Sequence, residues 1–207
     1  MNRPAILIEG AMRRVWALIV WRAAIVIWCR RIRIEGRSRV PNRPVIVVAN
    51  HSSHADTVLL QYALATCHKK PVQVAGAEDY WYRNRLLGAF SRALGVIAFP
   101  RRGEVGVHRV LRALDRRVSV VLFPQGSRSG GRFRGGIGRI AGRGDVEVLP
   151  VHVAGAQELL PKGTIRPRRS DVAVRFGEPV MLEPSETPEA FAARLERIVL
   201  VDLEIAA

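Results

Sequence analysis

Short runs of β-branched and apolar residues alternate with longer helix-like stretches along this chain of 207 residues. Each run is bounded by proline, glycine or polar residues, which is the pattern of strands buried on both faces of a sheet. The clearest runs are Val45–Ala49, Val96–Phe99, Val118–Phe123, Val146–Val153 and Val172–Phe176. The alternation predicts an α/β fold with a mixed, largely parallel sheet flanked by helices.

The length of the chain fits one domain with a sizeable core. We assign residues 32–207 to this domain, because no internal repeat and no linker divides them. Thr187 is placed to cap a final helix that begins at Pro188 and ends near Leu203. Residues 1–31 are assigned to an N-terminal membrane-associating helix.

The evidence for that helix is the almost wholly apolar stretch from Val15 to Cys29, which holds three of the chain's four tryptophans. Arg22 interrupts it, and fifteen residues are fewer than the roughly 20 that a spanning helix needs. Tryptophan suits the membrane interface, and arginine stems can extend along an apolar surface while the charge stays in water. We expect a helix lying shallowly in one leaflet, with a helix packed on the domain and a spanning helix as alternatives.

The charge of the chain requires an anionic partner. There are 33 basic against 18 acidic residues, a net charge of +15, and nearly all the basic residues are arginines. Nucleic acid and an anionic membrane both fit such a charge. Aromatic residues make up only 6% of the chain, and no nucleic-acid-binding motif is present, so we expect a membrane and no nucleic acid. Cys29 and Cys67 are read as free thiols of a reducing compartment, which places the protein on the cytoplasmic face of the cell membrane, peripheral or monotopic.

A polar motif directly follows the run Val45–Ala49, and it places His51 five positions before Asp56. An aspartate that bonds one ring nitrogen of a histidine fixes its tautomer and leaves the other nitrogen free to take a proton, so such a pair can activate a hydroxyl group. Three other roles are open. Asp56 could cap the next helix, His51 could be a loop residue bonded to backbone, and the two could bind a metal together with His54.

Three more blocks follow, at Gly95–Arg101, Val120–Ser129 and Val148–Val153. In this order and at these separations, the four blocks resemble those of the glycerolipid acyltransferases, the family of 1-acylglycerol-3-phosphate acyltransferases. That family carries an Asn-His-x4-Asp block, a Gly-x-x-Phe-x-x-Arg block, a Phe-Pro-Glu-Gly-Thr-Arg-Ser block and a Val-Pro-Val block. The resemblance covers roughly residues 32 to 180.

The resemblance implies that His51 and Asp56 are the catalytic pair. It also implies a substrate-binding set made of Arg101, Gln125, Gly126, Ser127 and Arg128. Phosphate oxygens are well matched by the fork of arginine and by the N–H groups of a Gly/Ser turn, so the residue types agree with such a role. The stretch Phe133–Gly136 is similar to a basic Phe-Lys-x-Gly sequence that often follows the third block.

Two positions depart from the family pattern. The phenylalanine of the second block falls on Ala98, with Phe99 one place later. The glutamate of the third block is Gln125, which keeps an acceptor oxygen, gains a donor and loses the negative charge. Loop ordering survives this change, whereas a charged contact with an arginine or with the acceptor does not. The departure therefore bears on the identity of the acyl acceptor.

The expected reaction moves a fatty acyl group from acyl-CoA or acyl-carrier protein to the free hydroxyl of a lysophospholipid such as 1-acylglycerol-3-phosphate, in phospholipid biosynthesis. It needs no metal and no other cofactor. Another lipid acceptor, a lyso-ornithine lipid or a glycolipid, is the alternative within this class. A metal-dependent hydrolase and an RNA-binding module are alternatives of other classes, the second because residues 129–136 are rich in arginine and glycine.

Overall fold

The structure is a computed structural model that describes Val15, Ile19 and residues 21–93, 95–100, 104–128, 130–144, 146–164 and 166–205. In this part of the chain, seven strands form one sheet in the order β1-β7-β6-β2-β5-β3-β4. The strands are β1 (Cys29–Glu35), β2 (Ile46–Ala49), β3 (Val72–Ala77), β4 (Val96–Phe99), β5 (Ser119–Leu122), β6 (Val148–Ala154) and β7 (Ser170–Phe176).

Most neighbouring strands run parallel. β6, β2, β5, β3 and β4 all point the same way, whereas β7 lies antiparallel to β6 and carries the parallel strand β1 on its outer side. The prediction of a mixed, largely parallel sheet is therefore confirmed. Because five parallel strands share one direction, their carboxyl ends meet at a single edge, where α/β folds bind ligands.

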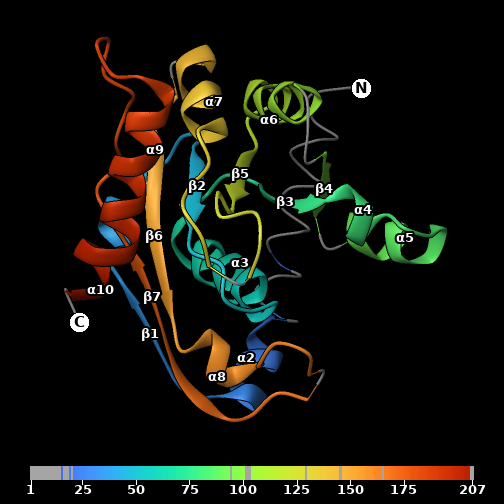
Figure 1. Ribbon diagram of the computed structural model, residues 1–207. Helices are drawn as coiled ribbons and strands as arrows, with labels where there is room; N and C mark the ends of the chain where they lie inside the picture. Colours follow the sequence, from blue (N-terminus) through green and yellow to red (C-terminus); the bar gives the residue numbers. More distant parts are fainter. Residues whose placement is uncertain are drawn as a thin grey trace.

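Helices cover both faces of the sheet (Figure 1). One face carries α3 (Ala55–Cys67), with α2 (Arg22–Trp28) and α8 (Ala156–Leu159) beside it. The other face carries α6 (Val105–Asp115), α7 (Gly136–Gly144) and α9 (Pro188–Arg197). The remaining helical segments are η2 (Arg37–Arg39), α4 (Glu78–Trp81), α5 (Arg85–Ala93), η3 (Ile198–Asp202) and α10 (Leu203–Ile205).

The central strands are continuous apolar runs because both of their faces are buried. In β2, Val47 packs toward α3, while Ile46 and Val48 pack toward α6, α7 and α9, and all three are fully buried. Burial of a side chain of this size contributes about 1.5–3 kcal/mol. The two apolar clusters lie back to back across the sheet, so the strands that carry the functional loops are held from both sides.

Two details differ from the sequence-based expectation. α7 was not expected, because its four glycines lower helix propensity. It forms because it packs closely on α9: a Cβ at Gly138 would lie 2.2 Å from the carbonyl oxygen of Pro188. β1 begins at Cys29, so the sheet already includes the last residues of the segment that we assigned to an N-terminal helix.

The described part of the N-terminal segment packs on the domain. Ile25 of α2 is buried in the core, and the indole of Trp21 donates to Gln61 of α3 at 3.3 Å. Val26 and Ile27, in contrast, are about two-thirds exposed. Among the residues that the structure describes, we find no helix that combines the length and the apolar character needed to cross a membrane.

Candidate active site

The candidate site lies where β2 and β5 end. These strands are neighbours and run parallel, so the loop after Ala49 and the loop after Leu122 leave the sheet side by side. The first loop carries His51 and the second carries residues 123–128. Two blocks that are more than 60 residues apart in the sequence are thus brought together, since the distance between His51 and Gln125 along the chain is 74 residues.

His51 and Asp56 form the expected pair. The Nδ1 atom of His51 lies 2.9 Å from Oδ2 of Asp56. The His51 side chain is 16% exposed, and that of Asp56 is completely buried. A buried carboxylate facing Nδ1 holds the proton on that nitrogen and leaves Nε2 to accept one. This is the arrangement of a general base and the group that orients it.

Asp56 also organises the turn before α3. The same Oδ2 atom accepts from the backbone N–H groups of Ser52 at 2.7 Å and Ser53 at 2.9 Å. Asp56 is not the N-cap of α3, because His54 occupies that position and Asp56 lies in the first turn. The helix-capping alternative is therefore wrong. The carboxylate has a different structural role, because its Oδ2 atom bonds both the loop backbone and the imidazole of His51.

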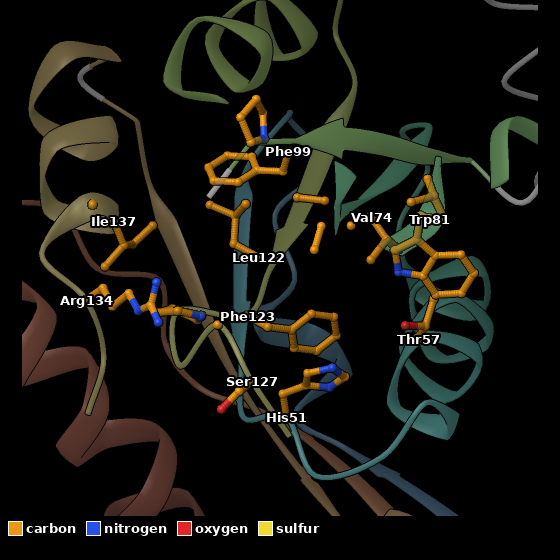
Figure 2. Close-up of a pocket in the computed structure, with 18 of the residues that line it drawn as sticks. His51, Thr57, Val74, Trp81, Phe99, Leu122, Phe123, Ser127, Arg134 and Ile137 are labelled. Atoms are coloured by element: carbon orange, nitrogen blue, oxygen red, sulfur yellow. The ribbon is translucent and has the colours of Figure 1, made fainter. Parts of the chain in front are cut away.

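Two residues that sequence reasoning missed complete the support of His51. The side chain of Asn50 donates to the carbonyl of Val153 at 2.8 Å and accepts from its N–H at 2.7 Å, which fixes the loop to β6. The ring of Phe123 stacks on the imidazole, with 4.2 Å between ring centroids and 22° between planes (Figure 2). A signal existed for both: Asn50 belongs to the first motif and Phe123 to the third, although neither residue type suggests a supporting role by itself.

The third block closes a tight turn. Gly126 adopts a φ of +68°, and its N–H donates to the carbonyl of Phe123 at 3.0 Å. That N–H group was expected to bind a phosphate, but the turn already uses it. Gly126, Ser127 and Arg128 do line the cavity beside His51, as expected. Gln125 does not line it, because its side chain is buried and its Oε1 accepts from the backbone N–H of His51 at 2.7 Å.

Arg101, the arginine expected from the second block, lies outside the described residues. Among the described residues, further cations border the cavity. The guanidinium of Arg134 packs over Gly126, where an added Cβ would come within 3.1 Å of it. Arg139 of α7 and Lys162 of the loop after α8 also line the cavity, and neither was among the predicted site residues.

The cavity has a volume of about 600 Å³ and two kinds of wall. Figure 2 shows apolar side chains such as Phe99, Leu122 and Val74 on one part of it, with Ser127 and Arg134 on another. The basic side chains along the described lining are Arg128, Arg134, Arg139 and Lys162, and no aspartate or glutamate belongs to that lining. His51 thus lines a cavity that has both an apolar chamber and a cationic wall.

His54 differs from His51 in its surroundings. Its ring meets the edge of Trp81, with 6.1 Å between centroids. Burial, followed by the charges of Arg128 and His51, lowers the pKa of His54, so its neutral form is favoured. The described residues contain no cluster of three His, Cys, Asp or Glu side chains that could hold a metal ion.

Comparison with known proteins identifies the class. The sequence model of the family described as Acyltransferase matches residues 31–154, which is more than half of the chain and includes the His51–Asp56 pair and the third block. The chain belongs to the Acyltransferase family. This finding confirms the resemblance seen in the sequence, and it replaces the RNA-binding and metal-dependent hydrolase alternatives.

Individual relatives agree with this family. A 1-acyl-sn-glycerol-3-phosphate acyltransferase of Streptococcus pneumoniae is 31% identical over 150 residues, which cover 69% of this chain and 53% of the relative. One from Limnanthes alba is 26% identical over 80% of this chain and 58% of its own length. The chain spans about half the length of these relatives. A lyso-ornithine lipid O-acyltransferase of Brucella abortus is 28% identical over 85% of this chain and 77% of its own length.

A solved structure shares the fold. The crystal structure of the 1-acyl-sn-glycerophosphate (LPA) acyltransferase PlsC from Thermotoga maritima superposes with a TM-score of 0.77, covering 99% of this chain and 80% of that one. The two sequences are 24% identical, so this likeness concerns the fold.

The two members of the His51–Asp56 pair should differ in their effect on stability. Asp56→Ala removes the acceptor of three N–H groups in a buried place, and a bond to a charged group is worth about 1.5–3 kcal/mol. His51→Ala removes only one of them. Urea unfolding should therefore show the larger loss of unfolding free energy for Asp56→Ala. Equal losses would contradict the role of Asp56 in ordering the turn.

Proposed function

We propose that this protein is a membrane-bound O-acyltransferase that transfers a fatty acyl group from a thioester to the free hydroxyl of 1-acylglycerol-3-phosphate or a close analogue. The observation that carries the proposal is that His51, paired with Asp56, lines a cavity with both an apolar chamber and a cationic wall. An acyl chain needs the first and a phosphate needs the second. The pair lies where the two substrates would meet.

In the proposed mechanism, Nε2 of His51 accepts the proton of the acceptor hydroxyl while the hydroxyl oxygen attacks the thioester carbonyl. Asp56 holds Nδ1–H and stabilises the imidazolium that forms. The tetrahedral intermediate collapses with loss of the thiol of coenzyme A or of acyl-carrier protein, which takes up the proton. Transfer is direct, so the proposal includes no covalent enzyme intermediate, no metal and no other cofactor.

The charge of the cavity wall bears on the acceptor. Arg128, Arg134 and Lys162 line the described cavity together with no carboxylate. A phosphomonoester carries close to two negative charges and suits such a wall. The amino group of an ornithine headgroup would find no acidic partner in this lining, and a neutral glycolipid would offer no negative charge to the cationic wall. The wall therefore favours lysophosphatidate, and with it a role in phospholipid biosynthesis.

A lyso-ornithine lipid is a second candidate acceptor. It is supported by the similarity to the Brucella abortus protein, which extends over more of that relative's length than the similarity to the first relatives does. Its carboxylate could use the same arginines. Relative rates on a panel of lysolipids, measured with labelled acyl-CoA and with acyl-carrier protein, separate the two acceptors and the two donors.

His51→Ala should lower acyl transfer by about 10²–10⁴-fold, because both the base and its alignment are lost. Product formation from labelled acyl-CoA and lysophosphatidate measures this. His108→Ala, at an exposed histidine of α6, serves as the matched control and should keep wild-type turnover. His54→Ala should be much milder than His51→Ala. A His51→Ala variant with more than a tenth of wild-type turnover would disprove the assignment.

Arg128→Ala should weaken use of a phosphate-bearing acceptor by about 1.5–3 kcal/mol, the scale of a lost charge-assisted contact. Arg128→Lys should restore only part of it, because lysine lacks the planar fork. Acceptor KM and kcat measured at fixed donor concentration give the effect, and Arg116→Ala at the exposed end of α6 is the control. If Arg128→Ala keeps both wild-type constants, the cationic wall does not bind the acceptor.

We also propose that the protein binds the cytoplasmic face of an anionic membrane. The binding surface would be the end of the molecule where α2 and α8 lie (Figure 1). Exposed Val26 and Ile27 of α2 provide an apolar surface there. Arg169 joins α2 to the loop after α8 by donating to the carbonyls of Val26 and Cys29 at 3.5 Å. The exposed cations of these segments are Arg22, Arg30, Lys162, Arg166, Arg168 and Arg169. Lys162 also lines the cavity, so lipid at this surface would lie close to its entrance.

Val26→Asp should weaken binding to vesicles that contain anionic phospholipid by about fivefold, because one charge near such a surface is worth about 1 kcal/mol. A point substitution is preferable to a truncation, since Ile25 and Cys29 belong to the core. Val201→Asp, at an exposed valine of η3, is the matched control. Co-sedimentation at low and high salt measures binding. Equal binding of Val26→Asp and Val201→Asp would contradict this surface.

A further inference from the structure

Gln125 occupies an unexpected place in the third block. The residues on either side of it, Pro124 and Gly126, both line the cavity, whereas Gln125 is 9% exposed and lies outside the lining. Its side chain is directed at the backbone of the neighbouring loop, where Oε1 accepts from the N–H of His51 at 2.7 Å. A side chain in this position acts on the histidine loop, which carries the proposed base.

That bond completes the fixation of the loop. The residue before His51, Asn50, is bonded in both directions to the backbone of Val153 in β6. The two residues after it, Ser52 and Ser53, donate their N–H groups to Asp56 of α3. The bond from Gln125 ties the backbone of His51 itself to the β5 loop. The loop is thus held by β6, by α3 and by the β5 loop at once.

We propose that Gln125 is a positioning residue for His51 and not a ligand of the acyl acceptor; this rests on the proposed role of His51 as the base. The feature that the bond requires is an acceptor oxygen, which an amide and a carboxylate both supply. The glutamine supplies it without adding a second negative charge to the contacts of a loop that the fully buried Asp56 already bonds. The replacement of the family glutamate by Gln125 should therefore not alter acceptor specificity, which would depend on the cationic wall.

Kinetics of three variants test this. Gln125→Met keeps an unbranched side chain and loses the oxygen, Gln125→Glu keeps the oxygen, and Gln157→Met is the same substitution at an exposed glutamine of α8. We expect Gln125→Met to lower kcat about 10- to 100-fold, which is the scale of a misplaced catalytic group. The acceptor KM should stay unchanged, and so should the ratio of the rates on lysophosphatidate and on lyso-ornithine lipid. Gln125→Glu should recover most of kcat with the same ratio, and Gln157→Met should match wild type.

A changed rate ratio or a raised acceptor KM in either Gln125 variant, at unchanged kcat, would overturn the proposal, because those effects belong to a residue that touches the acceptor. If Gln125→Met does not fold, Gln125→Glu still decides between the two roles.

A measurement without substrate separates this inference from the proposed function. Hydrogen exchange of the His51 backbone amide, followed by NMR of the full ¹⁵N-labelled chain, should become at least about tenfold faster in Gln125→Met and stay near wild type in Gln125→Glu, because exchange requires the N–H bond to open. Equal exchange in all variants would refute the positioning role. A wild-type protein that acylates neither lysolipid, yet shows the expected exchange, would refute the proposed function and leave the positioning of His51 intact.

Discussion

The candidate site depends on one oxygen atom, Oδ2 of Asp56. This atom receives the imidazole of His51 and the N–H groups of Ser52 and Ser53, and no part of the Asp56 side chain is exposed to solvent. Burying a carboxylate lowers the stability of the folded state unless hydrogen-bond donors surround it. Here the donors are the backbone N–H groups of the turn and the imidazole that the proposed reaction would use. Its other oxygen, Oδ1, has no hydrogen-bond partner among the described residues, so the stabilisation is concentrated on one side. The folding of the turn and the orientation of the proposed base are the same event.

The site also depends on the sheet, which brings side chains from sequence blocks that are far apart to one edge. Because β2 and β5 are parallel neighbours, the ring of Phe123 reaches the imidazole of His51 and stacks on it. The next strands in the sheet, β3 and β4, bring apolar side chains such as Val74 and Val96 to the same cavity. The apolar part of the lining follows from the strand order, whereas Arg128 and Arg134 come from the chain after β5 and Arg139 comes from α7. The described cavity therefore offers an apolar and a cationic surface in the same lining as His51.

Much of this arrangement could be predicted from the sequence. Apolar runs such as Val45–Ala49 identified the sheet, and the spacing of His51 and Asp56 identified the pair, because both signals are local. α7 could not be predicted, since its helix is stabilised by contact with α9 that only the absence of a side chain at Gly138 allows. Arg139 and Lys162 were missed for a similar reason. They reach the cavity from segments that carry no motif, and only the tertiary structure shows where these segments lie.

The third block shows why a motif and a binding site are different things. Sequence similarity marks residues 124–128 as one unit, but the structure gives its members different roles. Arg128 faces the cavity, Gly126 uses its N–H to close a turn, and Gln125 turns away to bond the backbone of His51. A substitution within the block therefore has no single meaning. At a position that faces the cavity, the loss of a charge would alter what is bound. At position 125 the bond needs only an oxygen, and a neutral amide provides it, so the chain can depart from its family there while the geometry of the proposed base is preserved.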